Sequence, residues 1–276
     1  MDKKIDIVIT MGGLGSRFRK MGYTVPKYMI EAKGKTLFEW SLISLEGFRN
    51  EAARYIFIAM KDENNDVKAF IEEKCATLGI SDHHIMILDY LTDGQATTAK
   101  LASKYWDPEN ALLIYNIDTY VEAGEMNSRE LKGDGFIPCF KAEGDHWSFV
   151  RLDENGRVAE IKEKKRISDH CTLGAYYFRT CALYEKLYDE FYITSEASDE
   201  DLNTSKEPRA LPGSGKTDSK STKNNDPQKL VNGEKYVAPL YDYLLSKGGE
   251  IYISDIDPKK VHVLGTPEEL KEFLGQ

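Results

Sequence analysis

The sequence predicts an α/β fold in which helices flank a mostly parallel mixed sheet that carries a small β-rich extension. Two observations indicate this fold. In the first half of the chain, short apolar runs rich in Ile and Val alternate with segments whose apolar residues recur at helical spacing. Such alternation is typical of parallel strands joined by helices that cover both faces of a sheet. After Asp118, several strand-like runs follow one another closely, which indicates strands that pair without intervening helices.

The first half is expected to contain four strands and three helices in alternation. The run "IDIVIT" predicts the first strand because it is short, apolar and rich in branched side chains, which suits a strand buried on both faces. The run "DVKAFIEEKCATLG" predicts a helix that ends at Gly79, because glycine readily adopts the left-handed conformation of a helix C-cap. The predicted strands are residues 5–10, 54–60, 84–89 and 111–118, and the predicted helices are residues 36–48, 66–79 and 94–106.

The second half is expected to add closely spaced strands and three further helices. The turn signal "DENG" predicts a hairpin between two of these strands. The run "TPEE" predicts the start of the last helix, with Thr266 as N-cap, Pro267 in the first turn and Glu269 completing a capping box. The predicted strands are residues 135–142, 147–153, 156–164, 172–179, 250–254 and 260–264, and the helices are expected near residues 180–192, near 237–246 and from Pro267.

Residues 196–232 do not follow this pattern. The stretch is polar and contains no aromatic residue, so it has too little apolar surface to offset the entropy that ordering would remove. It is predicted to be a flexible insertion, and the sequence leaves open whether it is a lid or merely disordered. The length of the chain suits one large domain over residues 1–276, with the predicted insertion inside it.

The composition excludes several classes of function. The net charge of −9 opposes binding to nucleic acid or to an anionic membrane, so an anionic substrate would need a local cluster of Lys and Arg. The four cysteines contain no CxxC pair and therefore indicate neither a zinc site nor a disulfide framework. No apolar stretch approaches the length of a membrane span, and the N-terminal run reads as a strand and not as a targeting segment. We therefore expect a cytoplasmic protein that binds neither nucleic acid nor membrane.

The stretch "MGGLGSRF" directly follows the first predicted strand. Its glycines, Gly12, Gly13 and Gly15, allow backbone N–H groups to approach a phosphate closely. Arg17 adds a permanently charged fork that can bind phosphate oxygens in two places. The pattern differs from a dinucleotide-binding loop, which would place a glycine where Phe18 stands. The stretch predicts a phosphate site, and a glycine-rich surface loop is the less specific alternative.

A second cation follows in the run "TVPKYMI". Pro26 restricts the backbone just before Lys27, so the ammonium group is presented with reduced freedom. Two cations and a series of amides at the C-terminal end of a strand predict a clamp for a polyphosphate. Asp118 ends another predicted strand at the same edge, where open α/β sheets bind ligands, although a carboxylate that caps a turn would look the same.

Together these motifs resemble the signature of the sugar-1-phosphate nucleotidyltransferase family. "GGLGSRF" is similar to its G-x-G-[ST]-R-[LF] loop, and "PKYM" is similar to its P-K-x-[LM] motif. Four later stretches resemble further family segments in the expected order: "TDGQATTAKLA", "YNIDTYV", "EIKEKKRISDHCTLGAYYF" and "VHVLGTPEEL". The resemblance covers most of the chain apart from the insertion. It implies a Rossmann-like sheet of the GT-A type in one domain, with the nucleotide in residues 1–122 and the sugar phosphate in residues 123–276.

The resemblance also implies a reaction. A sugar 1-phosphate, or a related phosphorylated acceptor, attacks the α-phosphorus of a nucleoside triphosphate, which releases pyrophosphate and gives an NDP-sugar for surface polysaccharide synthesis. Such in-line transfer needs positioning and charge neutralisation more than a covalent nucleophile. Arg17 and Lys27 are implied as the catalytic cations. The implied nucleotide-binding residues are Met11, Gly12, Gly13, Gly15, Ser16, Gln95 and Asn116.

The resemblance implies Mg²⁺ as the cofactor, held by Asp118, because this hard cation takes carboxylate and phosphate oxygens together. Many members of the family carry a second metal-binding Asp just before the closing G-T. Val263 and Leu264 stand there in this chain. The second ligand is therefore uncertain, with Asp257 and His262 as the alternatives.

For the acceptor, the resemblance implies Glu163 and Lys164 as a sugar-phosphate pair, with Gly174 and Tyr177 lining the pocket. A solvated charged face explains the first two residues nearly as well, and strand packing would explain the other two. The implied partners are a nucleoside triphosphate and a sugar 1-phosphate. The base, the acceptor and the oligomeric state are left open, and a homo-oligomer is compatible with the sequence.

Three other functions stay open at this point. A glycosyltransferase that consumes an NDP-sugar can share such a sheet and its metal-binding acid, but it does not need Arg17 and Lys27. A phosphocholine-type cytidylyltransferase shares the opening motif. A non-catalytic nucleotide-binding relative is compatible with the missing late Asp.

We expect that deletion of residues 198–230 leaves folding intact, because the stretch offers little apolar surface to a core. Thermal unfolding followed by circular dichroism measures this, with the full-length chain as the control. The expected change in Tm is below about 2–4 °C, the shift that 1 kcal/mol gives in a chain of this size. A deletion variant that fails to fold would show that the stretch is structural.

Overall fold

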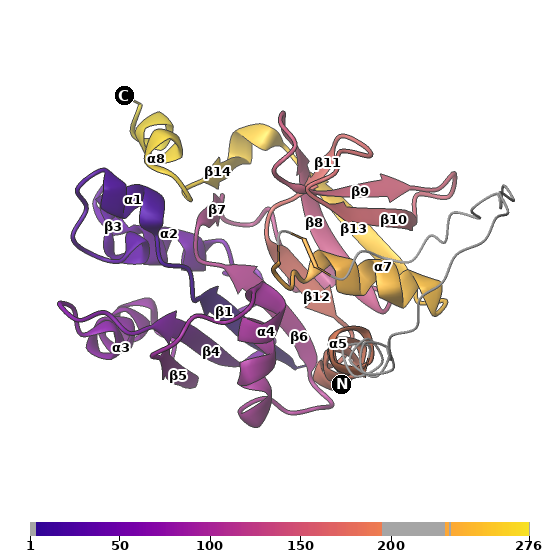
Figure 1. Cartoon of the computed structure of the whole chain (residues 1–276), viewed down its shortest axis with the longest axis horizontal. Helices are drawn as coiled ribbons and strands as arrows, with labels where there is room; N and C mark the ends of the chain where they lie inside the picture. Colours follow the sequence, from indigo (N-terminus) through magenta and orange to yellow (C-terminus); the bar gives the residue numbers. More distant parts are fainter. Residues whose placement is uncertain (1–3, 195–229, 232, 276) are drawn as a thin grey trace, which may run out of the picture.

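The structure is a computed structural model that describes residues 4–194, 230–231 and 233–275. Apart from residues 230 and 231, the stretch predicted as an insertion lies outside the described residues, so that expectation stays a prediction. The described chain is built around one large sheet with helices on both faces (Figure 1). This architecture confirms the predicted fold class.

The main sheet has ten strands, with a parallel half and a mixed half. Strand β1 pairs in parallel with β4 and β6, and β4 pairs in parallel with β5. Antiparallel pairing of β12 with β6 begins the mixed half, in the order β12–β8–β11–β9–β10, and β13 adds to β8 in parallel. The strands are β1 (Ile5–Met11), β4 (Ala52–Met60), β5 (His83–Leu88), β6 (Ala111–Asn116), β8 (Gly135–Lys141), β9 (Ser148–Leu152), β10 (Val158–Glu163), β11 (His170–Thr172), β12 (Ala175–Phe178) and β13 (Ile251–Ile256).

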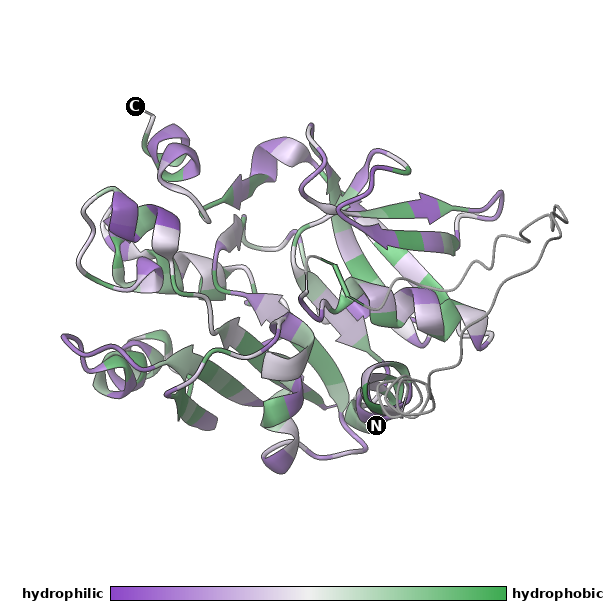
Figure 2. Ribbon diagram, viewed as in Figure 1, coloured by the Kyte–Doolittle hydropathy of each residue, from purple (hydrophilic) through white to green (hydrophobic). Residues whose placement is uncertain are grey.

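Two hydrophobic cores lie on the two faces of this sheet, and the strands between them are predominantly apolar (Figure 2). Neighbouring side chains of β1 point to opposite faces, as in any strand. Ile7 and Ile9 pack with α2 (Leu37–Ile43) and α3 (Val67–Leu78). Val8 packs with α4 (Gln95–Lys100), α5 (Cys181–Tyr188) and α7 (Ala238–Ser246). Burial on both faces explains why the first strand reads as a continuous apolar run.

A third, smaller core joins the N-terminal and C-terminal parts of the described chain. Phe18 from α1 (Ser16–Lys20) packs with Leu264 and with Leu270 of α8 (Pro267–Leu274). This contact brings the start of α8 close to the glycine-rich loop. No helix in the described ranges is long and apolar enough to cross a membrane.

Several short elements were not predicted because each is too brief to give a periodic pattern. They are α1, the hairpin of β2 (Glu31–Ala32) and β3 (Lys35–Thr36), and β7 (Thr119–Val121), whose partner β14 (Val261–Val263) is the strand predicted at residues 260–264. Short 3₁₀ turns are η1 (Lys27–Met29), η2 (Leu101–Lys104), η3 (Ser128–Glu130) and η5 (Pro258–Lys260), and α5 continues into a π-helical turn, η4 (Asp189–Ile193).

Two predicted strands end differently in the structure. The strand predicted at residues 172–179 forms only in part, because the chain breaks at Gly174, where φ is 89°. β12 lies within the predicted range, whereas Thr172 belongs to the separate strand β11. The predicted strand at residues 111–118 ends at Asn116. Asp118 therefore lies in the connection between β6 and β7. A side chain there can point along the edge of the sheet, whereas a side chain within a strand must point to one of its two faces.

We expect Thr36→Ala to lower the free energy of unfolding by about 1–2 kcal/mol, as the loss of an N-cap usually does. Thr36 begins α2 with a capping box: Glu39 N–H donates to Thr36 Oγ1 at 3.3 Å, and Thr36 N–H donates to Glu39 Oε2 at 2.8 Å. Denaturant unfolding measures the loss. Thr77→Ala is the control, because Thr77 bonds only within an exposed turn of α3 and should change stability by less than about 0.5 kcal/mol.

The same cap makes a pH-dependent contribution. Burial alone would raise the pKa of Glu39, but hydrogen bonds from Thr36 and the charge of Lys74 outweigh it and lower the pKa below 4.5. A carboxyl group with a lowered pKa stabilises the fold above its unfolded pKa and loses that effect as pH falls. The stability difference between the natural chain and Thr36→Ala should therefore shrink below pH 4.5. A difference that is constant with pH would contradict this account.

Candidate active site

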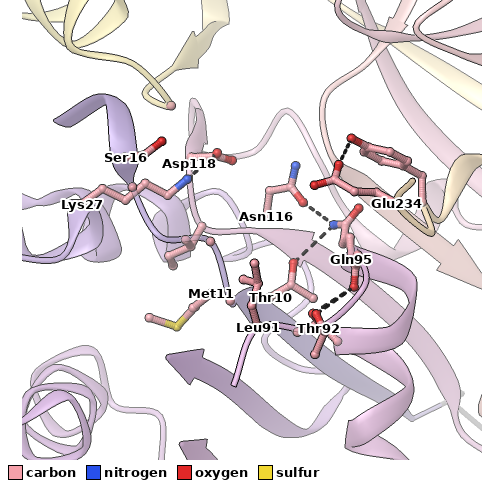
Figure 3. Close-up of a pocket in the computed structure, with 18 of the residues that line it drawn as sticks. Thr10, Met11, Ser16, Lys27, Leu91, Thr92, Gln95, Asn116, Asp118 and Glu234 are labelled. Atoms are coloured by element: carbon pink, nitrogen blue, oxygen red, sulfur yellow. Dashed lines mark hydrogen bonds and ion pairs between the residues drawn. The ribbon is translucent and has the colours of Figure 1, made fainter. Parts of the chain in front are cut away.

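A cavity of about 540 Å³ opens where β1 and β6 end (Figure 3). Their parallel pairing places Thr10 opposite Asn116, so the loops that follow the two strands leave the sheet side by side. The structure brings ten residues assigned from the sequence to this one cavity: Met11, Gly12, Gly13, Gly15, Ser16, Arg17, Lys27, Gln95, Asn116 and Asp118. The position agrees with the rule that open α/β sheets bind ligands beyond the carboxyl ends of their strands.

The glycine-rich loop forms one wall of the cavity. It leaves β1 at Met11 and enters α1 at Ser16, and no side chain caps the start of that helix. The first backbone N–H groups of a helix have no partner within the helix, so those of this loop can bind an anion. Arg17 is exposed at the same wall, and it makes no ion pair with any described residue. The wall therefore presents one mobile cation and several amide donors to a bound polyphosphate.

Lys27 and Asp118 contact each other in the cavity (Figure 3). Lys27 Nζ lies 2.7 Å from Asp118 Oδ2, and both side chains are largely buried. Pro26 holds the extended backbone, with φ −53° and ψ 144°, from which η1 and Lys27 begin. Partial burial strengthens such a pair relative to a surface ion pair, because solvent screens it less. The pair places a cation and an anion within reach of the same ligand.

The surroundings of Asp118 fit a magnesium ion. A Cβ atom on Gly265 would lie 3.2 Å from Asp118 Oδ2 and 3.5 Å from Glu269 Oε2, so the glycine keeps space open between two carboxylates. Glu269 Oε2 is buried and has no hydrogen-bond partner in the described part of the chain. Mg²⁺ binds one or two carboxylates together with substrate phosphates and water, which is the donor set that this corner offers.

Neither alternative for the second metal ligand lies at this corner. Asp257 is exposed, and its side chain caps η5 by accepting a hydrogen bond from Lys259 N–H at 3.0 Å. His262 stacks on Tyr120, with 5.2 Å between ring centres, because the β14–β7 register sets these two residues opposite each other. No group of three or more metal-binding side chains exists among the residues that the structure describes. Both assignments are therefore corrected.

Gln95 and Asn116 form a polar network on the other side of the cavity. Gln95 Nε2 donates to Asn116 Oδ1 and, at 3.3 Å, to Thr10 Oγ1 (Figure 3). Asn116 is fixed in turn by Gly174, because its backbone N–H donates to the Gly174 carbonyl at 3.1 Å. A Cβ on Gly174 would lie 2.2 Å from Asn116 Nδ2, so only glycine fits behind this side chain. Gly174 thus supports the cavity without lining it.

Glu163 and Lys164 approach the cavity through a neighbour. Glu163, at the end of β10, accepts a hydrogen bond from Ser148 Oγ, and burial raises the pKa of its carboxyl group. Lys164 Nζ donates to the hydroxyl of Tyr236 and lies 4.3 Å from the centre of its ring. Tyr236 lines the cavity, so the pair lies just behind the cavity wall.

Tyr177 does not lie at this site, and its predicted contact with the acceptor is corrected. It occupies β12, where successive side chains point to opposite faces of the sheet, and it belongs to the core that contains Ile7 and Ile9. It lines a different cavity, with Ile5 and Arg129, at the other end of β1. The sequence could not indicate which face of the sheet this side chain occupies, because every residue of β12 is buried.

The sequence did not reveal several residues that line the cavity. Thr10, Leu91, Thr92 and Thr98 lie one to four residues from assigned positions and carry no charge that would single them out. Glu234 and Tyr236 follow directly after the polar stretch predicted as an insertion. The return of an aromatic residue at Tyr236 was the available signal that the polar stretch has ended there.

Comparisons with known proteins support the fold class. No protein-family model and no curated protein matches the chain. Among solved structures, the chain is similar to a nucleoside-diphosphate-sugar pyrophosphorylase from Vibrio cholerae RC9, with 32% identity, a TM-score of 0.78, and coverage of 98% of this chain and 100% of that one. The fold alone is shared with two others at lower identity. An inositol-1-phosphate CTP transferase from T. maritima has 16% identity, a TM-score of 0.68 and coverage of 98% and 92%. A CTP:phosphocholine cytidylyltransferase from Streptococcus pneumoniae has 12% identity, a TM-score of 0.67 and coverage of 99% and 98%.

The fold is thus that of a nucleotidyltransferase, an enzyme of the transferase class. The similarity to the Vibrio structure extends over nearly the whole of both chains. The chain belongs to the sugar-1-phosphate nucleotidyltransferase family.

We expect Gly174→Ala to lower the free energy of unfolding by about 2–5 kcal/mol, the sum of left-handed backbone strain and overpacking against Asn116. Gly156→Ala is the matched control, because φ at Gly156 is 74° and nothing lies within 4 Å of its Cβ position. Denaturant unfolding of both variants separates strain, which both share, from the clash, which only Gly174→Ala has. Equal losses would show that Asn116 moves aside freely.

Proposed function

We propose that this protein transfers a nucleoside monophosphate from a nucleoside triphosphate to a sugar 1-phosphate, releasing pyrophosphate and forming an NDP-sugar. One observation carries the proposal: Lys27 and Asp118 form a close pair in the same cavity as the glycine-rich loop and Arg17. This arrangement supports phosphoryl chemistry, because it combines cations, amide donors and a carboxylate around one ligand. Membership of the family supports the same reaction.

In the proposed reaction, an oxygen of the acceptor phosphate attacks the α-phosphorus. A new O–P bond forms while the bond between the α-phosphorus and the pyrophosphate oxygen breaks. Lys27, which lines the cavity, would stand between the acceptor phosphate and the α-phosphate, two anions that must approach, and its ammonium would reduce their repulsion. Arg17 and the loop amides would bind the β- and γ-phosphates and neutralise the charge that develops as pyrophosphate leaves.

Asp118 is the residue proposed to hold Mg²⁺, with Glu269 next to the same space. When bound, the ion would neutralise and orient phosphate oxygens. Before substrates bind, Lys27 forms an ion pair with Asp118 at the edge of the sheet.

The acceptor is proposed to bind beyond Tyr236, near Glu163 and Lys164. Glu163 can accept hydrogen bonds from hydroxyl groups, which favours a polyol such as a sugar. The relatives named above for inositol 1-phosphate and phosphocholine show how widely acceptors differ on this fold. We propose a cytoplasmic role in which the product feeds surface polysaccharide synthesis.

The function is tested by incubating the protein with each of ATP, CTP, GTP, UTP and dTTP, with Mg²⁺ and a panel of phosphorylated acceptors. The panel contains hexose 1-phosphates, inositol 1-phosphate and phosphocholine. Pyrophosphate release is measured, and mass spectrometry identifies the product. Pyrophosphate with an NDP-sugar supports the proposal. Release only with phosphocholine would replace the acceptor class, and nucleotide binding without turnover would overturn the catalytic assignment.

We expect Lys27→Ala to reduce turnover by about 100- to 1,000-fold, because it removes a positive charge next to the reacting phosphates. Thermal unfolding confirms that the variant is folded. Lys68→Ala is the control, because Lys68 is an exposed residue of α3 and pairs only with Glu72 on the helix surface. Turnover of Lys27→Ala close to that of the natural chain would exclude Lys27 from the reaction.

A further inference from the structure

The tripeptide Glu234–Tyr236, here called the strap, lies across the start of α4. Its central residue bonds to the loop before α4 through the backbone on both sides. Lys235 N–H donates to the Asp93 carbonyl at 2.7 Å, and Ala96 N–H donates to the Lys235 carbonyl at 3.0 Å. The approach is close, because a Cβ on Gly94 would lie 2.3 Å from the Lys235 oxygen. The strap and this loop therefore pack as one unit.

An ion pair reinforces the same contact. Lys235 Nζ lies 2.9 Å from Asp93 Oδ2; the Lys235 side chain is only 7% exposed, whereas that of Asp93 is 46% exposed. Burial alone would raise the pKa of Asp93, but hydrogen bonds from Thr97 and Lys235 and the lysine charge outweigh it and lower the pKa. Removing Asp93 would take a carboxylate away from the buried Lys235 ammonium, which destabilises the contact.

Gln95 lies between these attachments in the chain. The strap bonds to Asp93 just before it and to Ala96 just after it. The backbone of Gln95 is therefore held on both sides, while its side chain is held by Asn116 and Thr10. A nucleobase that contacts Gln95 would meet an amide with little freedom to adjust, which favours discrimination between bases.

The other two residues of the strap face the acceptor end of the cavity. Glu234 and Tyr236 both line the cavity, and the Tyr236 hydroxyl donates to Glu234 (Figure 3). The same hydroxyl accepts a hydrogen bond from Lys164 Nζ. The backbone carbonyl of Tyr236 accepts one from Tyr192 Oη at 2.6 Å, which anchors the strap to η4. The strap thus contacts residues on the nucleotide side and on the acceptor side.

We propose that the strap is a positioning element for both substrates. Lys235 holds Gln95 where it selects the nucleobase, and Tyr236 holds Lys164 at the acceptor end. The inference rests on the proposed function, because it takes the cavity to bind a nucleotide and a phosphorylated acceptor. Glu234 and Tyr236 touch the cavity directly, whereas Lys235 acts only through the loop.

The first test measures equilibrium binding of ATP, CTP, GTP, UTP and dTTP, each with Mg²⁺, to the natural chain and to Lys235→Met. We expect the ratio of the weakest to the tightest Kd to fall about tenfold, at the low end of what losing an orienting partner does at metal sites. Lys235→Arg should restore the ratio, because it returns the charge. The control is Lys100→Met, which removes a 2.7 Å ion pair with Glu185 from the other end of α4.

Base discrimination separates positioning from stability, because a general loss of stability would weaken all five nucleotides alike. An unchanged ratio in a folded Lys235→Met variant, or no discrimination by the natural chain, would overturn the inference while leaving the proposed function intact. If the natural chain binds none of the nucleotides, both the inference and the proposed function fail. Should Lys235→Met not fold, Asp93→Asn provides the same measurement, since it removes the other charge of the pair.

The second test concerns Tyr236→Phe and uses the acceptor with the fastest pyrophosphate release in the panel above. We expect KM for the acceptor to rise about tenfold while Kd for the nucleotide stays unchanged, because the variant removes only the hydroxyl that holds Lys164. Tyr243→Phe is the matched control, because its hydroxyl donates to Glu190 at 3.2 Å away from the cavity. An unchanged acceptor KM would remove Tyr236 from the inference.

Discussion

The pairing of Lys27 with Asp118 depends on the register between β1 and β6, and the candidate active site depends on that pairing. The two residues are far apart in sequence, and they meet because parallel pairing sets Thr10 opposite Asn116. A shift of one residue in this register would turn the side chains of β6 to the opposite face of the sheet. The two cores that fix the register therefore also determine the geometry of the site.

The charges around the cavity are divided between its two ends. Arg17 and Lys27 stand on the side of the glycine-rich loop, where a polyphosphate would need them. Glu163 and Glu234 lie at the other end, with Lys164 between them through Tyr236. This division is compatible with the proposed binding of an anionic substrate by a protein whose net charge is −9, because Arg17 and Lys27 lie together beside the glycine-rich loop.

The strap shows how the stretch predicted as an insertion is compatible with a defined site. A long surface insertion adds little closure entropy per residue, so a fold tolerates it if the chain is fixed again where it returns. Here the chain is fixed by two backbone hydrogen bonds and the ion pair of Lys235 with Asp93. Glu234 and Tyr236, which follow the predicted insertion, thereby become part of the cavity wall.

The fold class, the family and the ten residues that meet at the cavity could be predicted from the sequence. Each of the ten residues lies in a short local motif or at the end of an apolar strand. The sequence also placed Thr266 correctly as the N-cap of α8. The positions of the other assigned side chains became clear only from the tertiary structure. Tyr177, Asp257 and His262 lie elsewhere because strand register and side-chain direction depend on long-range pairing, as does the approach of Gly265 to Asp118. The role of the strap could not be predicted either, since its backbone bonds to Asp93 and Ala96 join residues separated by more than one hundred positions in the chain.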